Sequence, residues 1–140
     1  MKPATADDVF DLMEAYATSA ALNAAMELGL FWLLAERPLA SLAIAQGLRI
    51  PANRCQYWLQ LLTATGLIEE TSAGYATSPA AQTAILEACS QDTWAFLARE
   101  AREVFPAVLD LALHIQKPAS TWAAQGLKPA DYFAEMVENP

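Results

Sequence analysis

Apolar residues recur at helical spacing from Thr5 or Ala6 to Leu28, and they occupy nearly every side of the predicted helix. Thr5 is a suitable N-cap, and Gly29 is a natural C-terminal stop. A helix that is hydrophobic all round is normally buried on every side. One small subunit offers little material for that burial, so the pattern predicts association with another subunit. The alternative is the central helix of a monomer.

Shorter helical segments follow this first helix. Their predicted ranges are Leu30–Glu36, Leu39–Gln46 and Pro51–Thr65. The breaks fall at Pro38, Gly47 and Gly66, which are residue types that end helices. One face of the second segment is predicted to hold Leu39, Leu42, Ala43 and Gln46, while Leu48 and Ile50 pack beneath the turn. In the third segment a core stripe is predicted at Cys55, Trp58, Leu59 and Leu62.

Residues 67–77 have the pattern of two short strands. Residues 67–70 and 75–77 are the predicted strands, and residues 71–74 are the turn, in which Gly74 allows the chain to reverse. Two short helices followed by a hairpin are typical of a winged helix-turn-helix. Ser78 and Pro79 then suit the N-cap and first position of a helix over Ala80–Ala88.

A long helical region is predicted over Gln91–Gln116, kinked or split by Pro106. A break at residues 117–120 and a short helix over Pro129–Glu138 complete the chain. The expected fold is mainly α: a winged helix-turn-helix-like domain with a small two-stranded β-wing, flanked by additional helices that form an intertwined dimer. We expect one domain over residues 1–140, with a winged-helix core at about 30–88 and a helical extension at 91–140.

The charge of the chain argues against a nucleic-acid partner. Eight Lys and Arg residues face 16 Asp and Glu residues, giving a net charge of −8, and the pI is near 4.4. Phosphate binding needs a basic footprint. The exposed side of the third helix is predicted to hold Asn53, Arg54, Gln56, Tyr57 and Gln60. A winged-helix transcriptional regulator stays an alternative, and it would need Arg49, Arg54 and Gln56 in a major groove.

Membrane and redox functions are also disfavoured by the sequence. Residues 15–35 carry only Glu27 as a charge, but the segment is rich in weakly apolar residues and is interrupted by Gly29. The acidic N-terminus does not resemble a secretory signal. Cys55 and Cys89 form no CxxC pair and have no histidine nearby, so neither a metal site nor a redox pair is indicated. We expect a cytoplasmic protein.

No catalytic constellation is visible in these residues. There is no Gly-rich phosphate loop and no nucleophile elbow, so no catalytic, cofactor or metal residue is predicted in this chain. His114 is more typical of a helix end than of a general base. Aromatic residues gather late in the chain, where they belong to the core or line an apolar pocket: Trp94, Phe96, Phe105, Trp122, Tyr132 and Phe133. A stand-alone dimer that binds a small apolar ligand is therefore a further alternative.

Several runs of the sequence resemble one enzyme family. These runs are Tyr16–Phe31, with its Leu-Gly-Leu-Phe end, Leu61–Ile68, Gly74–Pro79, and residues 131–140. They are similar to the N-terminal region of S-adenosylmethionine-dependent O-methyltransferases that act on small aromatic molecules. The resemblance implies a winged-helix-like dimerisation domain whose first helix interlocks with a partner and helps to enclose the acceptor substrate. The catalytic domain of that family, with its cofactor residues, is expected after Pro140 and is absent here.

The resemblance and the helical pattern together give the site predictions. We expect a homodimer whose contacts include Phe10, Met13, Tyr16, Ala17, Ala20 and Ala24. The candidate residues for the substrate wall are Tyr16, Trp94 and Trp122. The resemblance implies S-adenosylmethionine as cofactor of a parent enzyme and a small aromatic or polyketide-like acceptor. This chain alone is expected to be inactive as a methyltransferase.

Overall fold

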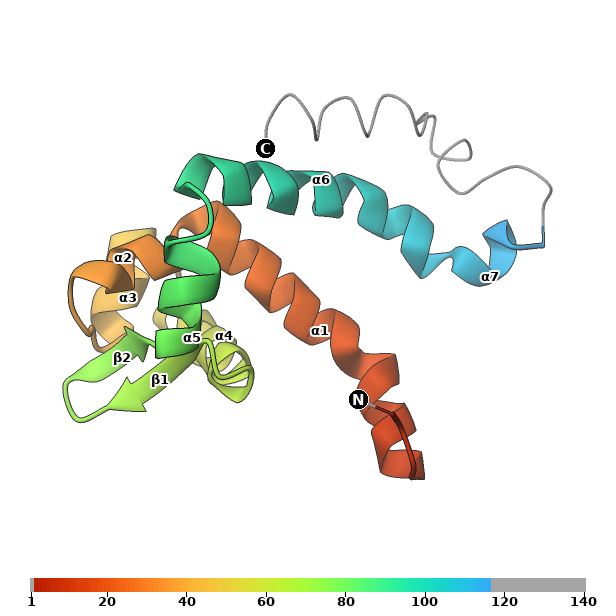
Figure 1. Ribbon diagram of the computed structural model, residues 1–140, viewed down its shortest axis with the longest axis horizontal. Coiled ribbons are helices and arrows are strands. Elements are labelled where there is room, and N and C mark those ends of the chain that lie inside the picture. Colours follow the sequence, from red (N-terminus) through yellow and green to blue (C-terminus); the bar gives the residue numbers. More distant parts are fainter. Residues whose placement is uncertain (1, 117–140) are drawn as a thin grey trace.

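The computed structural model describes residues 2–116 (Figure 1). The elements in chain order are α1 (Ala6–Leu28), α2 (Leu30–Glu36), α3 (Ser41–Leu48), α4 (Ala52–Ala64), β1 (Ile68–Thr71), β2 (Gly74–Thr77), α5 (Pro79–Ala81), the π-helix η1 (Gln82–Leu86), α6 (Gln91–Leu109) and α7 (Leu111–His114). The mainly helical, winged architecture is confirmed. The expected break at residues 117–120 and the helix Pro129–Glu138 lie outside the described residues.

Both ends of α1 form as the sequence predicted. The Thr5 hydroxyl accepts the Asp8 amide N–H at 3.2 Å, and the Asp8 carboxylate accepts the Thr5 amide at 2.9 Å. These two bonds are a capping box. At the other end Gly29 adopts φ 80°, and its N–H binds the Ala25 carbonyl at 3.0 Å. Glycine adopts this left-handed conformation without the strain that a side chain would add; among the described residues, the only close neighbour of a Cβ here would be the movable end of the Gln91 side chain.

The structure corrects the predicted bounds of the second short helix. Leu39 does not begin it, because Leu39 is extended and exchanges two backbone hydrogen bonds with Tyr75 of β2, at 2.8 and 2.9 Å. The helix α3 starts at Ser41, passes through Gly47 and ends at Leu48, with Arg49 as its C-cap at φ 58°. Leu39 has the spacing of a helical residue, but it forms backbone hydrogen bonds with β2 instead. Gly47 does not break the helix.

The face that the spacing assigned to Leu42, Ala43 and Gln46 is not the buried face of this helix. Ile44 and Ala45 are the buried residues of α3, whereas Leu42 is 59% exposed. Ile44 and Ala45 belong to the same core cluster as buried residues of α2 and α4. In α4 the predicted core stripe is largely confirmed, since Cys55, Leu59 and Leu62 are fully buried.

The wing is a tighter hairpin than the sequence predicted. β1 and β2 pair antiparallel from Ile68 opposite Thr77 to Thr71 opposite Gly74. Thr71 and Gly74 therefore belong to the strands, and only residues 72–73 form the turn. A side chain at Gly74 would collide with the backbone of Leu39, so glycine permits the close approach of these segments.

The later helices differ from prediction mainly in where they end. Ser78 caps its helix by accepting the Ala81 amide at 3.2 Å, but the helix widens into η1 and stops at Leu86 rather than Ala88. The long helix α6 continues past Pro106 to Leu109, and α7 begins at Leu111. The split therefore occurs beyond the proline, at Asp110.

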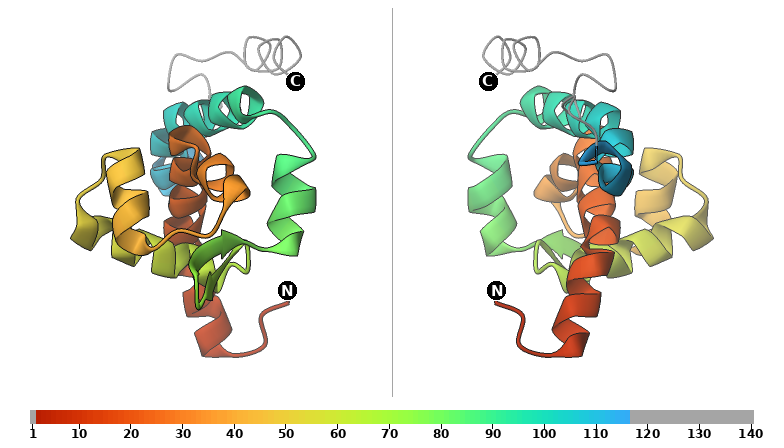
Figure 2. Two further views of the ribbon diagram at one scale, coloured as in Figure 1. Left: turned by 90° about the vertical axis from the view of Figure 1, so that its left-hand side faces the viewer. Right: turned by 90° about the vertical axis from the view of Figure 1, so that its right-hand side faces the viewer.

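A single apolar cluster holds the winged-helix part together. Its largest fully buried side chains come from α2, α3, α4 and β1: Phe31, Leu30, Ile44, Leu59, Leu62, Ile68 and Cys55. We call residues 30–86 the body. Figure 2 shows the N-terminal part of α1 extending past this body. Among the described residues no single helix is long and apolar enough to cross a membrane; only α1 and α2 taken together pass that test, across a bend of 63°.

Candidate functional site

Two long helices leave the body and diverge. α1 and α6 lie side by side near Gly29 and separate toward the N-terminus of α1 and toward α7 (Figure 1). We call α1 together with α6 and α7 the fork. The Trp58 indole N–H donates to the Ala21 carbonyl at 2.9 Å, which attaches α1 to α4. The Trp94 indole N–H donates to the Ile85 carbonyl at 3.0 Å, which attaches α6 to η1. The fork is thus anchored at its closed end only.

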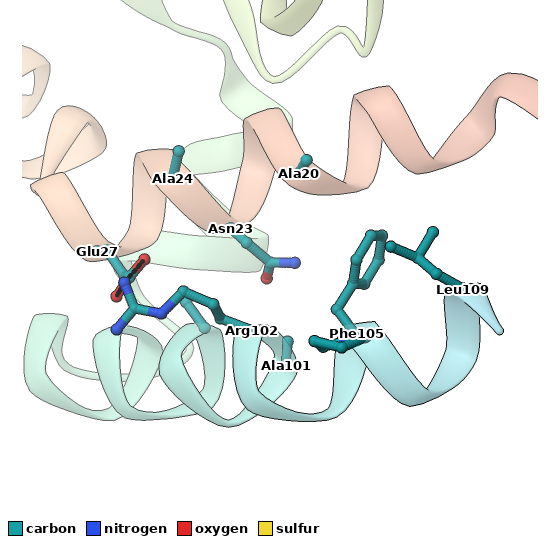
Figure 3. A pocket seen from close by; sticks show the side chains of 10 residues that line it. Ala20, Asn23, Ala24, Glu27, Ala101, Arg102, Phe105 and Leu109 are labelled. Atoms are coloured by element: carbon teal, nitrogen blue, oxygen red, sulfur yellow. Dashed lines mark hydrogen bonds and ion pairs between the residues drawn. The ribbon is translucent and has the colours of Figure 1, made fainter. Parts of the chain in front are cut away.

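A groove of about 280 Å³ lies between the two helices of the fork. It is lined by Ala20, Asn23, Ala24 and Glu27 from α1, and by Ala98, Ala101, Arg102, Phe105, Pro106 and Leu109 from α6. Figure 3 shows the Phe105 and Leu109 side chains at one end of the groove and the Glu27 carboxylate beside the Arg102 guanidinium at the other. Most of the residues between these ends are alanines, so the walls of the groove there are apolar and formed by small side chains.

An ion pair closes one end of the groove. The Arg102 Nη1 lies 3.1 Å from a Glu27 carboxylate oxygen, and the two side chains are 67% and 23% exposed. Arg102 also has acidic neighbours on its own helix, at Glu100 and Glu103. The structure shows a partner 75 positions earlier in the chain. No local signal in the sequence reveals a pair of this separation.

The predicted dimer contacts divide into two groups along α1. Phe10, Met13 and Tyr16 are 60%, 67% and 56% exposed. Ala17 is half-buried, and Ala20 and Ala24 lie on the groove. Large apolar side chains left on a surface in a contiguous set mark an interaction site. The role of these six residues as partner contacts stays a prediction, and the structure shows that the first three lack cover within the described chain.

The other arm of the fork is uncovered in the same way. α7 and the end of α6 expose a run of large apolar residues: Val108, Leu109, Leu111, Leu113 and Ile115. Both arms therefore present apolar surface away from the body.

The candidate substrate-wall residues are not brought together in this structure. Tyr16 is exposed on the free part of α1, whereas Trp94 is half-buried beside η1. Neither lines the groove, and Phe105 is the aromatic residue that does. Trp122, Tyr132 and Phe133 lie outside the described residues, and so does the side chain of His114.

The winged-helix surface has the exposure that its sequence predicted. Asn53, Arg54, Gln56, Tyr57 and Gln60 are exposed on α4. Glu69 and Glu70 are exposed on the wing, where a bound phosphate backbone would meet two carboxylates. Burial, together with the charge of Glu70, raises the pKa of Tyr75 beneath the wing. This face therefore offers little electrostatic attraction to phosphate.

The ionisable groups of the described residues form no reactive cluster. No group of three or more His, Cys, Asp or Glu side chains within residues 2–116 is placed to hold a metal ion. Burial raises the pKa of the Cys55 thiol, whose sulfur donates to the Ser41 carbonyl at 3.8 Å. A buried thiol with a raised pKa is a poor nucleophile.

Comparisons with known proteins agree with this geometry. The family model of the O-methyltransferase dimerisation domain matches residues 10–87, more than half of the chain. The chain is 30% identical over 129 residues to "N,N-dimethyltransferase OxyT" from Streptomyces rimosus, covering 92% of this chain and 38% of that protein.

Solved structures share the fold. "PigF with SAH" is 28% identical, with a TM-score of 0.71 over 84% of this chain and 39% of the other. The mitomycin 7-O-methyltransferase MmcR is 22% identical, with a TM-score of 0.71 over 95% of this chain and 40% of the other. The chain therefore spans about two fifths of the length of these relatives. On the match over residues 10–87, the chain belongs to the O-methyltransferase dimerisation domain family.

Proposed function

We propose that this chain is the dimerisation and acceptor-substrate-lid region of an S-adenosylmethionine-dependent O-methyltransferase. The observation that carries the proposal is the fork, in which Phe10, Met13 and Tyr16 are more than half exposed on a domain whose family is named for dimerisation. Fully burying one such side chain contributes about 1.5–3 kcal/mol. Because the family is a dimerisation domain, the proposed partner is a second copy of this chain, and its fork would be covered at the same time.

The cofactor of the parent enzyme is proposed from its relatives. One similar structure is described as containing SAH, and another is named an S-adenosylmethionine-dependent methyltransferase. S-adenosylmethionine would supply the methyl group. None of the described residues of this chain is assigned to binding it.

The acceptor is proposed to be a small aromatic or polyketide-like molecule, enclosed partly by α1. Tyr16 is the candidate for this role, because it projects from the free half of the helix. The acceptor atom is proposed as a hydroxyl oxygen. The relatives differ on this point, since one is named an N,N-dimethyltransferase and another a 7-O-methyltransferase.

The decisive experiment uses the longest reading frame that contains this chain. A frame that continues for about 200 residues, the size of one more domain, would be expressed and incubated with S-adenosylmethionine and with phenolic and arylamine acceptors. Methyl transfer to a phenol supports the proposal. Transfer to amines alone contradicts the oxygen assignment, and no transfer with any acceptor contradicts the enzyme assignment.

A control separates this proposal from the transcriptional regulator. Fluorescence anisotropy of a labelled DNA duplex, titrated with the chain at low salt, should show no salt-dependent binding. Binding that weakens as salt is added, and that is lost in the variant Arg54→Gln, would support the regulator instead. Arg54 is exposed on α4 and is not one of the proposed dimer contacts, so sedimentation of the variant should still show a dimer.

A further inference from the structure

Side-chain size changes halfway along one stripe of α1. Alternating steps of three and four residues place five side chains on one face of the helix: Phe10, Met13, Ala17, Ala20 and Ala24. The first two are large and more than half exposed, whereas the last three are alanines. Ala20 and Ala24 also line the groove against α6. The N-terminal half of the stripe therefore protrudes, and the C-terminal half is hollow.

We propose that α1 of a second copy lies antiparallel on this stripe, so that Met13 of each copy enters the groove of the other beside Ala24. This inference rests on the proposed function and adds the orientation and the register of the pairing. In that register Ala17 faces the partner's Ala20, and the two-fold axis passes between these layers. The contact is isologous, so one arrangement fills both grooves.

Size complementarity favours the antiparallel orientation over the parallel one. A parallel pair would set Met13 against Met13 and Phe10 against Phe10, where the stripe is widest. It would also leave the alanine half, with its groove of about 280 Å³, without an occupant. Unfilled apolar volume and crowded large side chains both destabilise packed interfaces. The antiparallel pair puts each large side chain opposite a small one.

Charge complementarity favours the same orientation. The first part of α1 is acidic, with Asp7, Asp8, Asp11 and Glu14. The far end of the helix carries Glu27, which is already paired with the 67% exposed Arg102. A parallel pair would bring two acidic ends together, and like charges placed side by side disfavour association. An antiparallel pair separates the acidic ends and brings each toward an Arg102 guanidinium.

The stripe lies within the residues that match the dimerisation-domain family. The matched region begins at Phe10, the first residue of the stripe, and includes all five positions. The occupant of the groove is thus a second copy of this chain, in a defined direction.

Cysteine cross-linking within the 140-residue chain tests the orientation. Met13→Cys and Ala24→Cys chains with different affinity tags would be co-expressed, and the mixed dimers would be isolated through both tags. Mild oxidation should cross-link most mixed dimers, because a disulfide needs the two Cα atoms within about 7 Å. Homodimers of either variant should give no more cross-linking than the parent chain, whose only cysteines are Cys55 and Cys89.

The outcomes separate this inference from the proposed function. Efficient cross-linking of Met13→Cys homodimers would overturn the antiparallel orientation while leaving dimerisation intact. A mixed dimer that fails to cross-link would overturn the register. A parent chain that sediments as a monomer would instead overturn the proposed function. Ala17→Cys paired with Ala20→Cys provides a second test at the two-fold axis, with smaller changes in side-chain size.

Discussion

The body and the fork contain similar apolar residues in opposite environments. In the body, Phe31 and Leu59 are fully buried by neighbouring elements of the same chain. In the fork, Phe10 and Met13 on one arm and Ile115 on the other are 60–71% exposed. Hydrophobic content alone therefore does not decide which residues form the core. The described chain buries the side chains of the body and leaves these side chains of the fork exposed, and our proposal is that a second copy covers them.

The largest loss of folding stability should come from truncating a phenylalanine in the body, and the same change in the fork should act differently. Phe31→Ala removes a fully buried ring from the body, and we expect the free energy of unfolding to fall by about 3–5 kcal/mol. Phe10→Ala is its matched control in the fork. Urea-induced unfolding followed by circular dichroism at several protein concentrations measures both changes. The Phe31 effect should be independent of concentration, whereas the Phe10 effect should grow with it, because it acts through association. Equal, concentration-independent effects would contradict the comparison.

A charge on the stripe should separate association from folding. Ala17→Glu and Ala20→Glu each place a carboxylate where a partner helix is expected, and we predict a loss of dimer affinity of about 100-fold or more, roughly 3 kcal/mol. Sedimentation equilibrium measures the affinity, and circular dichroism reports whether the helices persist. Thr18→Glu is the control, since Thr18 is exposed and lies about 100° further around the helix. A folded dimer that survives both alanine substitutions would remove α1 from the interface.

The attachment of the fork to the body should have a moderate effect. Trp58→Phe keeps the aromatic ring but removes the 2.9 Å hydrogen bond to the Ala21 carbonyl. We expect a loss of about 1 kcal/mol in the free energy of unfolding. The substitution should accelerate amide hydrogen exchange in α1 more than in α4. Trp94→Phe provides the comparison at η1, where the 3.0 Å bond to the Ile85 carbonyl is lost. Unchanged exchange in α1 would show that this bond does not hold the helix.

The smallest effect should come from acidifying the capping box of α1. Hydrogen bonds from the Ala4 and Thr5 amides lower the pKa of Asp8 below its ordinary value of 3.8. Asp8 therefore stabilises the folded helix above that value, and this contribution is lost as the pH falls through its lower folded-state pKa. Amide exchange in the first turn of α1, compared between the parent and Asp8→Asn from pH 6 downward, tests this. The variant should show faster exchange near neutral pH and converge with the parent in acid. A constant difference across the range would contradict it.

The helices with local signals were predictable from the sequence. Thr5, Gly29 and Ser78 act within a few residues of themselves, and the structure places helix ends where they indicated. The buried stripe of α4 also followed from spacing. Propensity and capping are local properties, so a single sequence is sufficient for them.

The errors arose where distant residues decide the structure. Leu39 pairs with Tyr75 of β2 instead of starting α3, which begins at Ser41. The Glu27–Arg102 pair joins helices at opposite ends of the described chain. The all-round apolar pattern of α1 led to the prediction of a partner, and the structure shows that the N-terminal half of α1 is largely exposed within the described residues. The pattern could not show that Ala20 and Ala24 face α6, because that depends on how the fork packs.

Sedimentation equilibrium of the unmodified chain is the direct measurement of whether the fork pairs with a second copy. We expect a species with twice the 15.1 kDa mass of one chain, because the exposed apolar side chains of the fork would be covered in a dimer. A single species of 15.1 kDa at all concentrations up to the solubility limit would contradict it.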